Sequence, residues 1–136
     1  DLLKAQRPAH WETIENVCDL GATLQDALKR YPQVIVDSLS QYIASSIVVR
    51  SENYSIDQIA AQLELEFKQV LQILANQDFS SRLGFVTSEV AAGLSPPRPA
   101  ARVFRQLTSR YNMQIAALCR SVVMVSAGIP EVIKSS

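Results

Sequence analysis

The 136-residue chain is poor in the residues from which most catalytic and metal sites are built. Its single histidine, His10, excludes multi-histidine metal centres, and its polar surroundings indicate a solvated side chain rather than the base of a Ser-His-Asp or Cys-His arrangement. The chain has four glycines and no Gly-rich phosphate loop, paired-carboxylate motif or nucleophile motif. We therefore expect no enzyme: no catalytic residue, no metal, no cofactor and no small-molecule substrate.

An excess of one charge and a long apolar run are also absent. Thirteen basic and thirteen acidic side chains give a formal net charge of zero, which argues against a uniformly basic nucleic-acid binder. The longest nearly apolar run, from Ile115 to Val125, is interrupted by Arg120 and is too short to cross a bilayer. We expect no contact with a membrane.

The two cysteines, Cys18 and Cys119, lie in apolar helical patterns without ligand-type neighbours. Such patterns favour buried free thiols over a disulfide. Free thiols fit a reducing compartment, which is the cytoplasm or, in a eukaryote, the nucleus. The chain begins at Asp1 rather than at Met, from which we expect a fragment of a larger protein. Its mass of 15.0 kDa fits a single domain over residues 1–136.

Apolar residues recur at helical spacing through most of the chain, so we expect an all-α fold, a bundle of five to six helices. The first helix is predicted from Trp11 to Arg30 and stops by Tyr31, because Tyr31 precedes a proline. Further helices are predicted over residues 34–49, 55–74 and 100–127.

Proline and glycine divide the chain after the third of these helices. Residues 79–87 form either a small hairpin or a loop followed by one helical turn, and we prefer the loop. The proline-rich residues 93–99 mark a boundary, and Pro99 fits the first turn of the long final helix. We expect a tri-helical unit over residues 32–92 and a long C-terminal helix over 98–128, with a tail after Pro130.

The stretch from Ser55 to Leu74 has the most specific pattern. Ser55 and Gln58 match a capping box, in which each side chain bonds the other residue's backbone N–H. The stretch resembles the helix-turn-helix of bacterial sigma factors and repressors, on the residues Ile59-Ala60, Leu63, Leu65, Val70 and Ile73-Leu74. It departs from that pattern at Glu64, where the turn usually has glycine, and at Glu66, where the second helix usually has a Ser or Thr cap.

The resemblance implies DNA binding, in a transcriptional or a replication and partition regulator. The second helix of the motif would then read bases with Lys68, Gln69 and Gln72. The charge distribution points the same way, because residues 1–66 carry ten acids and five bases whereas residues 67–136 carry three acids and eight bases. The phosphates would be held by a basic set at the start of the final helix, namely Arg98, Arg102, Arg105 and Arg110. The alternatives for this set are a solvated face and pairing with the acidic first half.

A second hypothesis is a helical module for protein–protein interaction or self-association, without DNA binding. Phe67 and Leu71 lie on the outward face that the motif would present, and both are apolar. Together with Val122 in the apolar second half of the final helix, they would form a contact surface. The two hypotheses differ in whether Phe67 and Leu71 are exposed beside Lys68 or buried.

Overall fold

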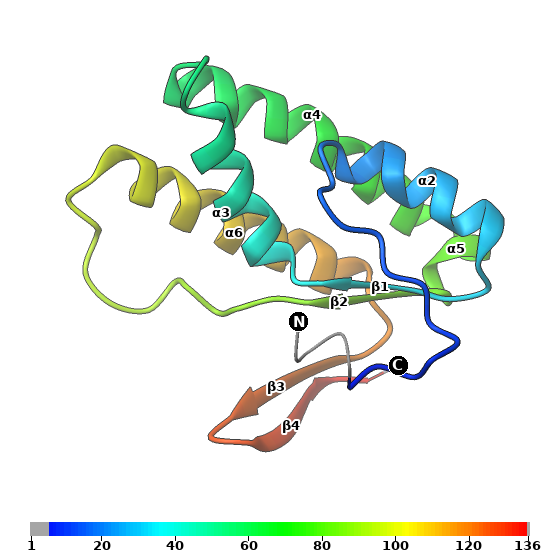
Figure 1. Cartoon of the computed structure of the whole chain (residues 1–136). Coiled ribbons are helices and arrows are strands. Elements are labelled where there is room, and N and C mark those ends of the chain that lie inside the picture. Colours follow the sequence, from blue (N-terminus) through cyan, green and yellow to red (C-terminus); the bar gives the residue numbers. More distant parts are fainter. Residues whose placement is uncertain (1–5, 136) are drawn as a thin grey trace.

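The computed structural model describes residues 6–135 and contains both helices and strands. Figure 1 shows the helices gathered above a pair of central strands and a hairpin below that pair. In chain order the elements are α2 (Leu20–Arg30), β1 (Val34–Asp37), α3 (Leu39–Arg50), α4 (Ile56–Ala75), α5 (Gln77–Ser80), β2 (Leu83–Val86), α6 (Pro99–Leu118), β3 (Val122–Ser126) and β4 (Ile129–Lys134). The all-α expectation is therefore wrong.

The two central strands, β1 and β2, are parallel and paired from Val34 with Leu83 to Asp37 with Val86. Both are short runs rich in β-branched or aromatic residues, which suits strands rather than helices. The side chains of Val36 and Phe85 pack against the helical core, whereas Ile35 on the other face of the sheet is half exposed. The predicted helix over residues 34–49 thus begins with a strand.

Several helices begin or end at the residues that the sequence predicted. α2 ends at Arg30 with Tyr31 as its C-cap, and Pro99 occupies the first turn of α6. The capping box of α4 is formed: the Ser55 hydroxyl accepts a bond from the Gln58 N–H at 3.3 Å, and the Ser55 N–H donates to the Gln58 side chain at 2.9 Å. These features depend on a few neighbouring residues, so the local sequence determines them.

The stretch that resembles a helix-turn-helix is one uninterrupted helix of 20 residues, α4. Glutamate is a good helix former, and Glu64 and Glu66 lie in its middle with no turn between them. The apolar positions form one continuous buried stripe across the expected turn, comprising Ile59, Leu63, Phe67, Val70 and Leu74. The helix-turn-helix geometry is therefore absent.

The second half of the expected final helix is also different. α6 ends at Leu118, and the following apolar residues form the antiparallel hairpin β3–β4, closed by Ala127 and Gly128. Both turn residues have positive φ, 51° and 79°, as a tight two-residue hairpin turn requires. Val122, Val123 and Val125 are β-branched and pair better in a strand than in a helix.

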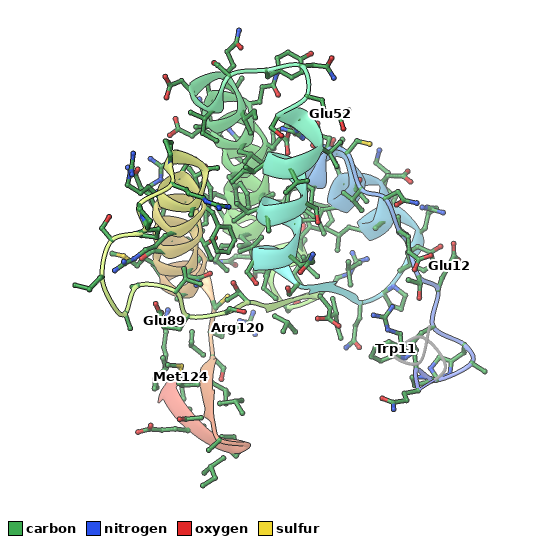
Figure 2. All side chains as sticks on the ribbon, turned by 60° about the vertical axis from the view of Figure 1, so that its left-hand side comes forward. Trp11, Glu12, Glu52, Glu89, Arg120 and Met124 are labelled. Atoms are coloured by element: carbon green, nitrogen blue, oxygen red, sulfur yellow. The ribbon has the colours of Figure 1, made fainter. Side chains whose placement is uncertain are left out.

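The hairpin extends away from the helices, and Met124 is labelled on it in Figure 2. Lys134 in β4 joins it to α6, because its Nζ donates to the carbonyls of Ala116 and Ala117 at 2.9 and 2.8 Å. These are carbonyls of the last helical turn, where a cation is favoured by the helix dipole. The expected C-terminal tail is therefore strand β4.

The segment before α2 is not helical between Trp11 and Asp19, so the first predicted helix starts nine residues late. The Asp19 side chain caps α2 by accepting from the Ala22 N–H at 3.0 Å. Cys18, which the pattern predicted to be buried, is exposed in this segment, and Cys119 is partly buried. Both thiols are free, as predicted.

The core is centred on the contact between α4 and α6. Phe67 is fully buried and its ring stacks on that of Tyr111, with centroids 3.6 Å apart and planes 11° from parallel. Truncating a buried aromatic side chain of this kind typically costs about 3–5 kcal/mol. No helix in the described part of the chain is both long and apolar enough to span a membrane.

A partly buried polar network joins α3, α4 and the segment before α2. The Arg50 guanidinium pairs with Glu66 at 2.7 Å and donates to the Cys18 carbonyl at 2.7 Å. The Tyr42 hydroxyl donates to the other oxygen of Glu66 and accepts from the Leu20 N–H at 3.2 Å. Burial and the hydrogen bond to Glu66 raise the pKa of Tyr42 well above its ordinary value of 10.0.

We expect Gly21→Ala to lower the free energy of unfolding by about 1–3 kcal/mol, since α2 and α4 touch at this glycine. An added Cβ would lie 2.8 Å from the Gln69 Cβ and 3.2 Å from the Glu66 carbonyl oxygen. Urea denaturation measures the change. Gly84→Ala is the matched control, because its Cβ would meet only Ile35 at 3.7 Å. Equal stabilities for the two variants would contradict the tight contact.

We expect Tyr42→Phe to lower the free energy of unfolding by about 1–3 kcal/mol at neutral pH. Because the folded-state pKa of Tyr42 is raised, its contribution is complete below pH 10 and is lost as the pH rises toward the folded pKa. The stability difference between wild type and variant should therefore shrink above pH 10. Urea titrations across this range measure it, with the exposed Tyr54→Phe as control. A difference that stays constant with pH would show that the network does not depend on the Tyr42 proton.

Candidate active site

The carboxyl ends of β1 and β2 lie side by side, because the strands are parallel and in register up to Asp37 and Val86. In open α/β sheets, ligands bind in the crevice outside this edge. Both strand ends are polar: Asp37 is the last residue of β1 and Ser38 follows it, and Thr87 and Ser88 follow β2. This edge is therefore the candidate active site.

A chain of hydroxyl groups links the two strand ends. The Ser38 and Ser40 hydroxyls lie 3.3 Å apart, and Ser40 donates to the Ser88 hydroxyl at 3.3 Å. Ser40 is buried in the first turn of α3, so the packing around it fixes its position. The chain gives the edge a row of groups that can either donate or accept hydrogen bonds.

Asn112 in the middle of α6 fixes the end of β2. Its side-chain NH₂ donates to the Ser88 carbonyl at 3.0 Å, and its oxygen accepts from the Thr87 hydroxyl at 2.8 Å. Both functions of the amide are thus used on adjacent residues of one strand end. Because α6 also carries Tyr111 into the core, the position of this edge depends on the packing of α6.

Asp37, the last residue of β1, places a carboxylate at this edge, and 56% of its side chain is exposed. The Arg7 guanidinium lies 3.6 Å from it and also donates to the Thr13 hydroxyl at 3.1 Å. The N-terminal segment therefore brings a positive charge next to the carboxylate. Within residues 6–135 no group of three or more His, Cys, Asp or Glu side chains could hold a metal by itself.

The segment that follows the edge, residues 89–97, is held on α6 by two arginines. Arg105 donates to the carbonyls of Ala91, Gly93 and Leu94, the last two at 2.9 and 2.7 Å. Arg102 donates to the carbonyls of Pro96 and Pro97 at 3.3 and 2.6 Å. A guanidinium carries five N–H donors, and here they replace the hydrogen bonds that a strand or helix would provide.

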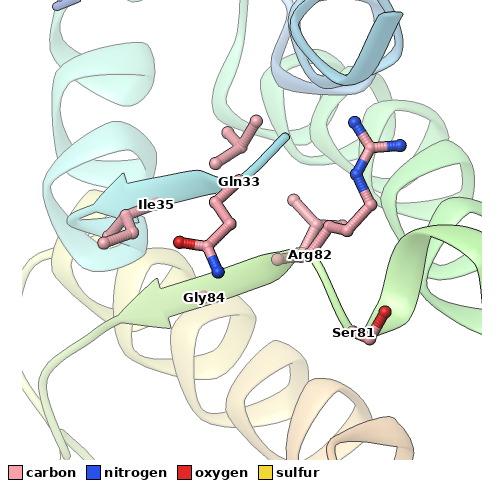
Figure 3. A pocket seen from close by; sticks show the side chains of 7 residues that line it. Gln33, Ile35, Ser81, Arg82 and Gly84 are labelled. Atoms are coloured by element: carbon pink, nitrogen blue, oxygen red, sulfur yellow. The ribbon is translucent and has the colours of Figure 1, made fainter. Parts of the chain in front are cut away.

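A hollow of about 160 Å³ lies at the opposite, amino-terminal end of the two strands (Figure 3). Gln33, Ile35 and Ser81 line it together with Arg82 and Gly84. The Arg82 guanidinium donates to the carbonyls of Leu28, Tyr31 and Pro32, at the C-terminal end of α2 and just beyond it. Arg82 thus uses its Nε and Nη2 to hold the end of α2, which is a structural role.

A second hollow of about 250 Å³ lies between α4 and α6 and includes Lys68 and Arg110. Arg110 pairs with Glu64 at 2.6 Å across it. This agrees with the alternative that basic groups of the second half pair with the acidic first half. Such an exposed pair contributes little to stability.

The predicted base readers all lie on the surface of α4. Lys68, Gln69 and Gln72 are exposed, and the Gln69 side chain also lies against Gly21 of α2. Among the predicted phosphate contacts, Arg98 is exposed, but Arg102, Arg105 and Arg110 are bonded to the groups described above. Three of these four arginines are therefore engaged in contacts within the chain.

The three residues of the predicted contact surface are buried or partly buried within the chain. Phe67 is fully buried, Leu71 packs against the core, and Val122 lies partly buried at the start of β3. The sequence leaves open whether Phe67 is exposed beside Lys68 or buried, and in the structure Phe67 is buried.

The residues of the strand-end site were missed because no local motif marks them. Asp37 and Ser88 are brought together by strand pairing across about 50 residues of sequence, and Asn112 comes from α6. One signal was present: two short apolar runs, ending at Val36 and Val86, are each followed at once by acid or hydroxyl residues. Parallel strands with polar carboxyl ends have this pattern.

Comparison with known proteins identifies the family. The model of the CobU family, described as cobinamide kinase / cobinamide phosphate guanyltransferase, matches residues 2–133. The bifunctional adenosylcobalamin biosynthesis protein CobU of Salmonella typhimurium is 29% identical over 134 residues, which cover 96% of this chain and 74% of that protein. CobU of Escherichia coli is 28% identical over 131 residues, covering 94% and 72%. CobP of Pseudomonas aeruginosa, with the same description, is 25% identical over 131 residues, covering 96% and 70%.

These matches overturn the functional expectations from the sequence. The DNA-binding hypothesis, the interaction-module alternative and the helix-turn-helix resemblance are wrong, because the matched proteins are enzymes of small-molecule biosynthesis. The expectations of no enzyme and no small-molecule substrate fail for the same reason. The family model spans nearly the whole chain, and the α/β architecture replaces the all-α one. The chain belongs to the cobinamide kinase / cobinamide phosphate guanyltransferase family.

Proposed function

We propose that this protein acts on cobinamide as a kinase and on cobinamide phosphate as a guanyltransferase, at the carboxyl edge of β1 and β2. The observation that carries the proposal is the family match over residues 2–133. The edge supports it, because it places an exposed carboxylate, a guanidinium and a row of hydroxyls where open α/β sheets bind ligands. A cytoplasmic location belongs to the same proposal and accords with the two free thiols.

Both reactions move a phosphorus group from a nucleotide, so the protein's task is to position the reactants and to stabilise negative charge. Asp37 is the group at this edge suited to Mg²⁺, which binds one or two carboxylates and takes its remaining ligands from water and phosphates. A single carboxylate fits such an ion, although it would not fit a metal held by protein groups alone. The ion would supply charge neutralisation on the phosphates.

The other groups of the edge have complementary roles. The fork of Arg7 can bind a phosphate in place of its present contact with Asp37, since guanidinium suits phosphate and carboxylate alike. The hydroxyls of Ser38 and Ser88 can orient a substrate hydroxyl or a phosphate oxygen. Asn112 holds the Ser88 end in place, so it is a positioning residue.

We expect Asp37→Asn to lower phosphoryl transfer to cobinamide on the order of 10²-fold or more, because the variant loses the charge that holds Mg²⁺. The assay follows label from a nucleoside triphosphate labelled in its γ-phosphate into cobinamide phosphate. A parallel assay with GTP labelled in its α-phosphate follows guanylyl transfer to cobinamide phosphate.

The matched control is Asp26→Asn, which removes an exposed carboxylate paired with Arg30 on α2 at 3.1 Å. It should leave both transfers unchanged. Absence of both transfers in the wild-type protein would overturn the proposed function. Full activity in the Asp37 variant would instead place the metal at another site.

A further inference from the structure

We propose that the segment from Glu89 to Pro97 forms the rim of the site and that Leu94 on it contacts the macrocycle of cobinamide. This inference rests on the proposed function and adds the residue that binds the large substrate. The segment starts directly after Ser88 at the strand edge. Figure 1 shows it sweeping from the end of β2 around to the start of α6.

Leu94 is the most exposed large apolar side chain described, with 96% of its surface open to solvent. An exposed leucine in a freely moving loop needs no explanation, since it can turn toward the protein. Here the backbone is fixed on both sides of the side chain, because Arg105 binds the carbonyls of Gly93 and Leu94 at 2.9 and 2.7 Å. These hydrogen bonds therefore keep the Leu94 side chain exposed to solvent.

The backbone conformation at Gly93 contributes to this arrangement. Its φ is +94°, which side-chain-bearing residues rarely adopt, and no atom lies within 4 Å of the place where a Cβ would be. Glycine is thus required by the conformation and not by a tight contact. Two successive carbonyls reach one guanidinium as a result, and the leucine that follows is presented outward.

The chemistry of the rim suits a large, partly apolar ligand rather than a phosphate. Arg105 uses Nη1 and Nη2, and Arg102 uses Nη1, on the segment's own carbonyls. Apart from Glu89 and Ser95, the side chains along the segment are apolar, from Val90 through Ala91 and Ala92 to Pro97. Cobinamide is a broad corrin ring with hydrocarbon and amide substituents, so it offers the apolar surface that such a rim would cover.

In this arrangement the two substrates are bound by different groups. The charged edge around Asp37 and Arg7 takes the nucleotide phosphates, and the rim takes the ring. Leu94 would contact the substrate, while Arg105 acts through the backbone and is a positioning residue. Variants of either residue should therefore separate the binding of cobinamide from that of the nucleotide.

The experiment measures dissociation constants of the full chain for cobinamide and for GTP with Mg²⁺, each by equilibrium dialysis. We expect Leu94→Ala to weaken cobinamide binding about 10-fold, because the lost carbons no longer bury apolar surface, and to leave GTP binding unchanged. Leu65→Ala is the matched control, since Leu65 is a 67% exposed leucine on α4. It should change neither constant.

Arg105 provides a second, independent variant. Arg105→Gln should weaken cobinamide binding at least as much as Leu94→Ala, and Arg105→Lys should restore part of it, since one ammonium cannot reproduce the guanidinium fork. A loss confined to cobinamide distinguishes positioning from general destabilisation, which would lower both affinities and the Tm together.

The outcomes separate the two proposals. Wild-type binding of cobinamide that Leu94→Ala leaves unchanged overturns the rim while the proposed function stands. No binding of cobinamide by the wild-type chain overturns the proposed function, and the rim with it. Equal weakening of cobinamide and GTP in the Leu94 variant also contradicts the rim, because the residue would then act on the site as a whole.

Discussion

The stacking of Tyr111 on Phe67 is the contact on which the rest of the structure depends. It packs α6 against α4 in the core, and α6 in turn fixes two parts of the candidate site. Asn112, the next residue, holds the end of β2, and Arg105 holds the segment beyond. One face of α6 thus supplies stability while the adjoining face sets the geometry of the site.

The parts of the fold that the sequence predicts are those decided by neighbouring residues. The capping box of Ser55 and Gln58, the end of α2 before Pro32 and the start of α6 at Pro99 all belong to this group. Strands of four to six residues give too short a pattern to be distinguished from a turn or two of helix. The pattern therefore predicts β1 as the start of a helix and β3 as the continuation of α6.

The candidate site was beyond local reasoning for a related reason. Its members, Asp37, Ser88 and Asn112, are ordinary polar residues whose proximity arises from strand pairing and helix packing. The helix-turn-helix pattern misled because its apolar spacing is shared by any long amphipathic helix, and Glu64 and Glu66 were the residues that contradicted it. The basic stripe misled because guanidinium groups satisfy backbone carbonyls as readily as phosphates.

The packing of α6 on α4 has a mechanical consequence. The helix has 20 residues and bears the rim at its start and the Lys134 attachment of the hairpin at its end, with Tyr111 between them. At 1.5 Å per residue, its first residue lies about 18 Å from Tyr111, so a tilt of about 5° would move that end by roughly 1.5 Å. The aromatic stack therefore acts as a pivot, and a small repacking in the core displaces the start of α6 and the segment attached to it.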